Sequence, residues 1–475
     1  MKVTCLMNKY KSLLINIGLF ALNALATKLM AFILMPLYTL YFTSSEFGVM
    51  DMTTIVINLV FPVFTVSISN AVLRFVIDDK AHAKFYITEG LMVVFISCLI
   101  VFMCLPILNL SIFGGLGKYK CWFLISYIFC ALQAYLAEVA RAVDQIRLIS
   151  ISAVCSSLVM AGSAYIAIVL FKLGLIGYFI SFIIGNVLAS LIFMFGGKQW
   201  KWLSVRDWIK TRGIRKELYR YALPLAPNTV GWYVGTTFSR FLITGILGVG
   251  FSGLYAAASR IPNMLNALQQ IFSSAWQVSS FQEYKKKSVE HFYSVIWSFY
   301  LVGMSLGSSV IILLSNWLAS ILMQKNFYNA WTLIPVLVFA FFVDSINNFQ
   351  GIIFQAKMKT KSLMMTTLIG AAVCVTTTAL TLNSMGIMGA CFGVVIGNIA
   401  ILIIRGRAVT QLMVVNWHYP MMVVLMAFIV VQVVMVVFVT TIPYIVPCIL
   451  CVVQIVFSIL FLNPYITSHR NVKDK

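Results

Sequence analysis

The sequence predicts an all-α fold, a membrane-embedded bundle of about fourteen transmembrane helices. The first observation is composition: 61% of the residues are apolar and only 10% are charged, whereas soluble domains are about one quarter charged. The second is continuity, because the apolar residues form runs of the roughly 20 residues that cross a bilayer as a helix, without the alternation of a membrane β-barrel. The third is the placement of the basic residues.

Fourteen apolar segments follow one another along the chain. They are predicted as helices at 12–40, 49–77, 87–110, 121–141, 149–171, 174–197, 222–247, 250–280, 292–315, 329–356, 362–383, 386–404, 419–440 and 444–463. An even number of spans puts both termini on one side of the membrane. The ten cysteines lie mostly inside apolar runs, where cysteine usually acts as a small hydrophobic residue, so we predict no disulfide and no metal site. We also predict no cofactor.

The basic residues predict which side of the membrane each connection faces. Of the 34 Lys and Arg residues, 26 fall in one alternating set of connections and four in the other. The first set includes the segment with Arg405 and Arg407 and is predicted to be cytoplasmic, because basic residues concentrate there. Both termini are then cytoplasmic, and the net charge of +21 does not indicate a nucleic-acid partner. Glu89 and Glu138, near cytoplasmic helix ends, are predicted to be solvated.

An internal repeat predicts the domain organisation. The motifs at 173–177 and 184–186 recur at 385–389 and 396–398 with a constant offset of 212 residues. Each half is also predicted to open with a helical hairpin, turning at Phe47–Gly48 and at Ser252–Gly253. Six helices per copy give both copies the same orientation, the plan of parallel-repeat transporters. We predict a six-helix lobe at 1–197, a basic linker at 198–221, a second six-helix lobe at 222–407 and two further helices in 408–475.

The linker is predicted to be an interfacial cytoplasmic helix or a plain tether between the halves, and these two interpretations are compatible. Its tryptophans and basic residues are typical of a segment that lies along a membrane surface.

Ionisable residues within the spans predict a functional site, since a charge at membrane depth is costly and usually faces a partner or a wet cavity. The four internal bases are Lys28, Arg74, Arg240 and Arg260. They fall in the first two predicted helices of each half, which can line a central cleft. Such a cleft favours an anionic ligand, because Arg binds phosphate bidentately and Lys acts as a point charge. Arg74 is close enough to a helix end to snorkel instead.

Polar residues at helical spacing support a wet face on these helices. The candidates for lining the cleft are Asn23, Asn58, Asn263, Gln270 and Asn348. Asp344 is the acidic residue that we place near the middle of the membrane. It is a candidate for coupling to an ion gradient, or a structural partner for a base.

The amino-terminal third also carries a family resemblance. The runs 36–41 (PLYTLY), 45–48 (SEFG) and 70–75 (NAVLRF) resemble the signature of the Wzx family of polysaccharide repeat-unit (O-antigen) flippases, in the multidrug/oligosaccharidyl-lipid/polysaccharide exporter superfamily. In length, helix plan and duplication the resemblance covers the whole chain. It implies a two-lobed, MATE-like bundle with alternating access and an undecaprenyl-pyrophosphate-linked oligosaccharide as substrate.

The resemblance also implies site residues. The related lipid II flippase has functional arginines in helices 1, 2 and 8, and Lys28, Arg74 and Arg260 occupy comparable helices. Lys28 stands in place of an arginine, which weakens a bidentate role there. The implied partners are the lipid-linked oligosaccharide, membrane lipids, a polysaccharide polymerase and a chain-length regulator.

Two other functions stay open at the level of the sequence. One is a drug or cation antiporter on the same fold, although such proteins often have an acidic residue in helix 1, where this chain has Lys28. The other is a membrane polymerase or glycosyltransferase. Enzymes of that kind usually carry catalytic residues in a sizeable outer loop, and the predicted outer loops are very short. We therefore predict a transporter rather than an enzyme.

Overall fold

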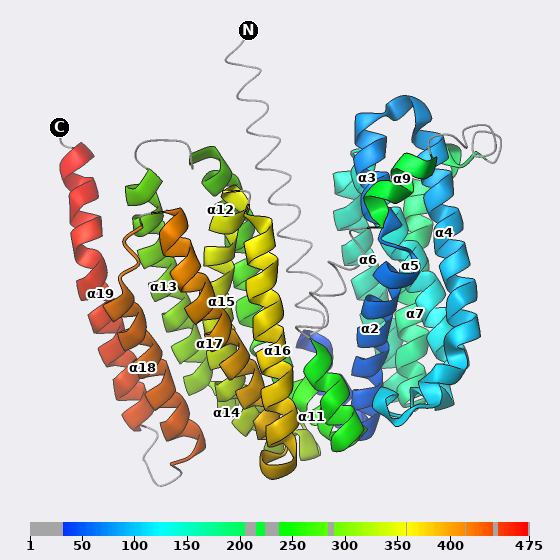
Figure 1. The fold of residues 1–475 in the computed structure, drawn as a ribbon. Helices are drawn as coiled ribbons and strands as arrows, with labels where there is room; N and C mark the ends of the chain where they lie inside the picture. Colours follow the sequence, from blue (N-terminus) through cyan, green and yellow to red (C-terminus); the bar gives the residue numbers. More distant parts are fainter. Residues whose placement is uncertain are drawn as a thin grey trace. The chain divides into compact units, whose positions relative to one another are not determined.

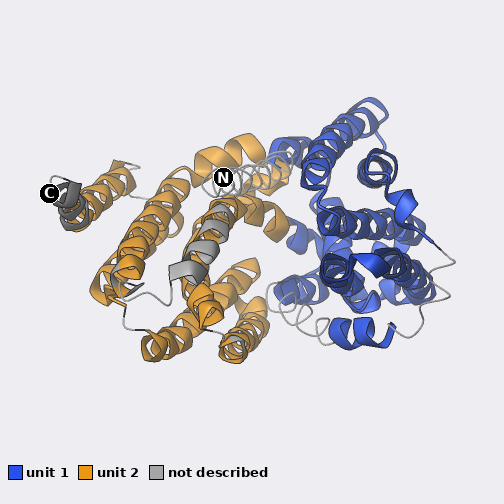
Figure 2. Ribbon diagram, turned by 90° about the horizontal axis from the view of Figure 1, so that it is seen from above, with its two compact units in different colours: residues 1–253 blue, residues 254–475 orange. Residues whose placement is uncertain are grey.

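The computed structural model describes residues 32–204, 215–223, 237–283, 289–357, 359–413, 415–439 and 445–473. Over these residues the chain forms helices joined by short turns (Figure 1). It divides into two compact units, Met1–Gly253 and Leu254–Lys475 (Figure 2). The sequence predicted lobes at 1–197 and 222–407, and those lobe boundaries stay predictions.

The first unit is a bundle in which α5 packs against α3, α4 and α7, and α7 packs against α6. Buried tyrosines help to fix this packing, since the Tyr135 hydroxyl donates to the Ile87 carbonyl at 2.5 Å and the Tyr127 hydroxyl to Ser97 Oγ at 3.1 Å. The helices are Phe32–Tyr41, α2 (Ser44–Phe64), α3 (Ile68–Asp78), α4 (Ala83–Cys104), α5 (Lys120–Ala142), α6 (Ile146–Tyr165), α7 (Leu175–Leu191), α9 (Arg215–Ala222) and residues 237–246.

The second unit is built around α15, most of whose residues are buried. This helix packs against α12, α13, α16, α17 and α18, and the aromatic rings of Phe272, Trp276 and Phe349 stack at its contact with α12. The helices are α11 (Val249–Arg260), which begins in the first unit, α12 (Asn263–Glu283), α13 (Val289–Leu313), α14 (Ser315–Leu322), α15 (Leu333–Ala356), α16 (Thr360–Met385), α17 (Ile387–Leu412), α18 (Tyr419–Val437) and α19 (Ile445–Lys473).

Eleven helices of the described residues are long and apolar enough to cross a membrane. They coincide with the second to sixth and the ninth to fourteenth predicted helices, which confirms the all-α membrane fold. The first and seventh predicted helices lie partly outside the described residues, and the eighth is interrupted. The total of fourteen spans stays a prediction.

The second helix of each predicted lobe is broken in two. This corrects the continuous helices expected at 49–77 and 250–280. The first break separates α2 from α3, where Val66 and Ser67 both have φ of 52°, a conformation that is strained for a β-branched residue. The second separates α11 from α12 at Ile261–Pro262. Each break lies at or shortly after a proline, which cannot donate the helical hydrogen bond and obstructs the preceding turn.

The predicted turns at Phe47–Gly48 and Ser252–Gly253 are also wrong by about one helical turn. Helix α2 already begins at Ser44, because Thr43 caps it. Thr43 Oγ1 accepts from the Glu46 amide at 3.2 Å, and Glu46 Oε2 accepts from the Thr43 amide at 2.8 Å. This reciprocal capping box satisfies two amides that a helix start leaves unpaired. Gly48 and Gly253 therefore lie inside α2 and α11.

The repeated motif has the same backbone conformation in both copies. Gly174 and Gly386, which are 212 residues apart, precede α7 and α17 with φ of 54° and 59° and ψ of −132° and −142°. Only glycine adopts this region without strain. The matched glycines one turn later, Gly177 and Gly389, each press against the end of the preceding helix. The agreement supports the predicted duplication at this place in the fold.

Within the second unit, hydrogen bonds between buried side chains join the last two helices, α18 and α19, to α13. Ser309 Oγ on α13 donates to Gln432 Oε1 on α18 at 2.7 Å, and Gln432 Nε2 donates to the Ser309 carbonyl at 3.2 Å. Gln454 Nε2 on α19 donates to Ser305 Oγ at 3.3 Å. In an apolar interior these side chains have few other partners, so α18 and α19 are docked at defined positions on α13.

Candidate functional site

Two of the ten predicted site residues, Lys28 and Asn23, lie outside the described residues. Of the others, Arg74 lies one turn before the end of α3 with its side chain 63% exposed, and its Nε is 2.8 Å from Asp78 Oδ2. This arrangement fits the snorkelling interpretation as well as a ligand contact. Asn58 is exposed on α2, two turns beyond Asp51.

Arg240 forms an ion pair that the sequence did not predict. On the helix of residues 237–246, its Nη1 contacts the Asp51 carboxylate of α2, and the two side chains are 19% and 5% exposed. The sequence predicts Arg240 as a cation for the ligand and indicates no acidic partner for it. Since the two charges offset each other, Arg240 adds less positive potential than predicted.

Arg260 lies at the break in the eighth predicted helix. It is the last residue of α11, at the break before Pro262, and its side chain is half-buried. Interrupted helices at membrane depth occur where the backbone is buried in protein or lines a wet cavity. One turn on, Asn263 Oδ1 accepts from Asn266 Nδ2 at 3.2 Å, and Gln270 is exposed two turns further along α12. Asn263 and Gln270 therefore stay predicted members of a polar face on this helix.

Asp344 lies on α15 beside a cation that the sequence placed elsewhere. Arg405 was assigned to a cytoplasmic connection, which is wrong, because α17 continues to Leu412 and Arg405 is only 5% exposed. The guanidinium is close enough to Asp344 for electrostatic attraction. Asn348, a predicted cleft-lining residue on the same helix, is exposed one turn later.

The hydrogen bonds of Arg405 explain why the helix can bury it. Its Nη1 donates to the Asn347 carbonyl at 2.8 Å. Its Nε and Nη2 donate to Thr366 Oγ1 at 3.2 and 3.0 Å, and Nη2 also donates to Thr367 Oγ1 at 2.9 Å. The amide of Gln350, which is 0% exposed, has no hydrogen-bond partner for either polar atom among the described residues. The adjoining hydroxyl pair Thr366–Thr367, on a neighbouring predicted helix, was the one sequence signal for a buried base here.

Glu89 corrects a second prediction, because it is buried rather than solvated. On α4, its side chain is 5% exposed, its Oε2 lies 2.9 Å from Arg215 Nη2, and its Oε1 accepts from the Tyr219 hydroxyl at 2.9 Å. Both partners belong to α9, in the basic linker. Burial and the Glu89 carboxylate raise the pKa of Tyr219, so this hydroxyl stays a donor. The described end of the linker is thus a helix docked on the first unit.

Replacing Glu89 tests this docking. Glu89→Ala leaves Arg215 and Tyr219 without their shared acceptor, and hydrogen bonds to a charged group contribute about 1.5–3 kcal/mol. We expect backbone amides of α9 to exchange at least about tenfold faster, since 1.4 kcal/mol corresponds to a factor of ten. Hydrogen–deuterium exchange of the 215–222 peptide measures this. Glu138→Ala is the matched control, because Glu138 pairs with Arg141 on its own helix. Equal protection of α9 in the two variants would contradict the docking role of Glu89.

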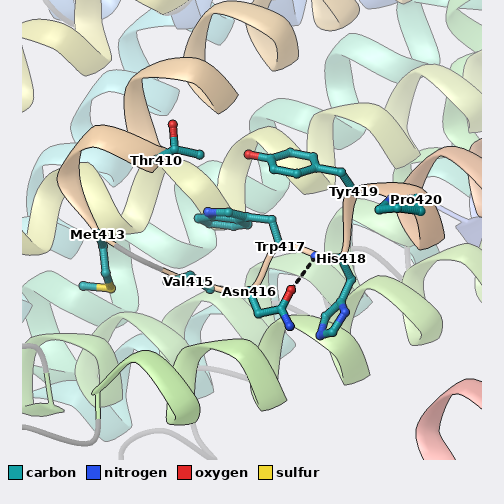
Figure 3. Close-up of a pocket in the computed structure, with 8 residues that line it drawn as sticks. All are labelled: Thr410, Met413, Val415, Asn416, Trp417, His418, Tyr419 and Pro420. Carbon is teal, nitrogen blue, oxygen red and sulfur yellow. Dashed lines mark hydrogen bonds between the residues drawn. The ribbon is translucent and has the colours of Figure 1, made fainter.

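Two cavities lie away from the predicted site residues. A groove of about 550 Å³ between α5, α6 and α7 is lined by Arg141, Ser152 and Asn186 among others. A pocket of about 450 Å³ lies between the end of α17 and the start of α18 (Figure 3). There, burial lowers the pKa of His418, and the His418 amide donates to Asn416 Oδ1 at 3.3 Å. Neither cavity is lined by any of the ten predicted residues.

Solved structures share this fold. An inward-facing multidrug-resistance MATE transporter of the MOP superfamily is similar with a TM-score of 0.68 at 15% identity, over 82% of this chain and 94% of that chain. A MATE transporter from Vibrio cholerae gives 0.58 at 17% identity, over 86% and 99%. A MOP-superfamily transporter from Pyrococcus furiosus, reported to have a binding pocket of reverse polarity, gives 0.56 at 16% identity, over 82% and 96%. The predicted MATE-like fold is confirmed.

The sequence itself matches one family model. No curated protein sequence matches the chain significantly, but residues 13–281 match the family described as polysaccharide biosynthesis protein. The match spans more than half of the chain and includes the runs that resembled the Wzx signature. The chain therefore belongs to the polysaccharide biosynthesis protein family, and it is a multi-pass membrane protein with the fold of these MATE transporters.

Proposed function

We propose that this protein is a flippase that carries undecaprenyl-pyrophosphate-linked oligosaccharide units across the bacterial inner membrane, with both termini in the cytoplasm. The observation that carries the proposal is Arg260, a half-buried cation at a helix break, followed by the polar residues Asn263 and Gln270 on α12. The family connects the chain to polysaccharide synthesis. The mostly apolar helix surfaces suit a substrate whose polyprenyl tail stays in lipid.

In this mechanism the guanidinium of Arg260 donates to the pyrophosphate, and Lys28 adds a second positive charge. Uncharged polar side chains such as Asn58, Asn263, Gln270 and Asn348 contact the sugars. The protein then exposes the site first to the cytoplasm and then to the outside. A proton or sodium gradient drives the cycle through Asp344, and the dependence of transport on either gradient in proteoliposomes distinguishes the two ions. A polymerase and a chain-length regulator are the expected partners for the exported unit.

A binding experiment tests the substrate class. Purified protein in nanodiscs should bind undecaprenyl pyrophosphate, and Arg260→Gln should weaken that binding at least about tenfold, since hydrogen bonds to charged groups contribute about 1.5–3 kcal/mol. Arg407→Gln is the matched control, because Arg407 is exposed near the end of α17. Unchanged affinity in Arg260→Gln would overturn the role of this residue.

The competing function is a drug or cation antiporter, because multidrug transporters share the fold. Tetraphenylphosphonium, an organic cation, is the discriminating probe in the same assay. Preference for this cation over undecaprenyl pyrophosphate would replace the flippase with the antiporter.

A further inference from the structure

The ion pair between Asp51 and Arg240 joins segments that are 189 residues apart in the sequence. Both side chains are mostly buried, at 5% and 19% exposure. A buried charge that loses its partner is strongly destabilising, so the two helices carrying these residues are held together as long as both charges are buried.

The contacts around this pair concentrate at one end of α2. Phe113, in the connection between α4 and α5, packs edge-on against Phe241, with ring centroids 6.1 Å apart. Gly48 on α2 and Gly114 both lie directly against Val249, and Gly253 lies directly against the Ser44 carbonyl. All of these residues belong to the first compact unit. Close glycine contacts on both sides mean that α2 and the start of α11 meet backbone to backbone.

The predicted repeat and topology indicate which parts of the protein meet at this junction, the contacts of α2 and the 105–119 connection with residues 237–253. Residue 51 and the 105–119 connection belong to the first predicted lobe, whereas residues 237–253 belong to the second. The turn before α2, the 105–119 connection and the turn before α11 are all predicted to lie on the outer side of the membrane. The junction therefore joins the second helix of the first predicted lobe to the first two helices of the second predicted lobe, at their outer ends.

We propose that the Asp51–Arg240 pair is an outer latch, which keeps the substrate path closed to the outside until the pair separates. This inference rests on the proposed function and adds the step that controls outward opening. It also assigns Arg240 to the latch rather than to the ligand. Asp51→Asn or Arg240→Gln should then favour outward opening, while the charge-swapped protein Asp51→Arg/Arg240→Asp restores the pair and the closed state.

Thiol labelling from the outer side tests the latch without any substrate. In a background with the native cysteines replaced by serine, Asn58→Cys reports on the α2 face two turns beyond Asp51, and a membrane-impermeant maleimide is applied to intact cells. Labelling of Asn58→Cys should be at least about tenfold faster with Asp51→Asn or Arg240→Gln than with the pair intact, as expected if 1.4 kcal/mol or more of closing free energy is lost. The charge swap should restore slow labelling. Ser111→Cys, exposed on the 105–119 connection, is the control and should be labelled equally in every variant.

Two results would overturn the latch: unchanged labelling of Asn58→Cys in both single variants, or a charge-swapped protein that is labelled as fast as they are. The charge-swapped protein also separates loss of the ion pair from a general loosening of the packing, because only loss of the ion pair is reversed by the swap. The outcome is independent of the ligand. If labelling becomes faster in the single variants but undecaprenyl pyrophosphate does not bind, the proposed substrate class is wrong and the latch is supported. If undecaprenyl pyrophosphate binds but the labelling rate does not change, only the latch is wrong.

Discussion

Arg405→Met is expected to destabilise the second unit by about 3–5 kcal/mol, the usual cost of removing one member of a buried charged pair. Methionine fills much of the same volume but donates no hydrogen bond. The Asp344 carboxylate then loses its neighbouring cation, while Thr366, Thr367 and the Asn347 carbonyl lose their donor. Thermal unfolding of the purified protein in detergent measures the change. Arg407→Met, an exposed position on the same helix, should unfold at the wild-type temperature.

The second variant of this experiment isolates the charge effect. If Arg405 acts partly by offsetting Asp344, then Asp344→Asn combined with Arg405→Met should be less destabilised than the sum of the two single changes, because the double variant contains no isolated charge. Strict additivity would show that Arg405 acts only through its hydroxyl and carbonyl acceptors. An Arg405→Met protein as stable as wild type would contradict the whole account of this site.

Gly253→Ala is expected to have the second largest effect, a destabilisation of about 1–3 kcal/mol, typical of an added methyl group in a packed contact. A Cβ at this position would overlap the Ser44 carbonyl and lie 2.8 Å from the Gly48 amide nitrogen. Both atoms belong to backbone, so α2 and α11 must move apart. Thermal unfolding measures the loss, and faster labelling of Asn58→Cys from the outside would show that the same junction has opened.

The matched control is Gly303→Ala on α13, where a Cβ would meet nothing within 4 Å. Alanine is favoured over glycine inside a helix by up to about 1 kcal/mol, so this variant should be as stable as wild type or slightly more stable. Equal behaviour of the Gly253 and Gly303 variants would show that the α2–α11 contact is looser than described.

The spans were predictable because hydropathy is a local property: a run of about 20 apolar residues specifies a crossing whatever surrounds it. The helix caps and helix breaks could be predicted only in part from the sequence. Pro62 is a residue that disrupts a helix locally, but the turn at Val66–Ser67 depends on packing that favours a strained conformation. Thr43 and Glu46 have the spacing of a capping box, which would have placed the start of α2 correctly.

Charged residues were harder to place, because their positions depend on partners distant in the sequence. Arg405 follows the rule that basic residues lie in connections until Thr366 and Thr367, about 40 residues earlier, supply acceptors. Asp51 and Arg240 each had the features of isolated polar residues, and Glu89 of a solvated one. The residue type alone predicts the charge and hydrogen-bonding capacity of each of these side chains. Their partners could not be predicted, because they are brought together only by the folded structure.

The Gln–Ser contacts of the last two helices also bear on how the protein is made. The side chains that receive α18 and α19 lie on α13, more than 100 residues upstream of Gln432 and Gln454. During synthesis, Ser305 and Ser309 are therefore inserted well before their partners leave the ribosome. Until then the Ser305 hydroxyl, which donates to the Val302 carbonyl of its own helix, has no Gln454 amide from which to accept a hydrogen bond. The packing of the second unit therefore requires the final two helices. A chain interrupted after α17 would expose the polar residues Ser305 and Ser309 of α13 to lipid, and we expect such a chain to be recognised by membrane proteases.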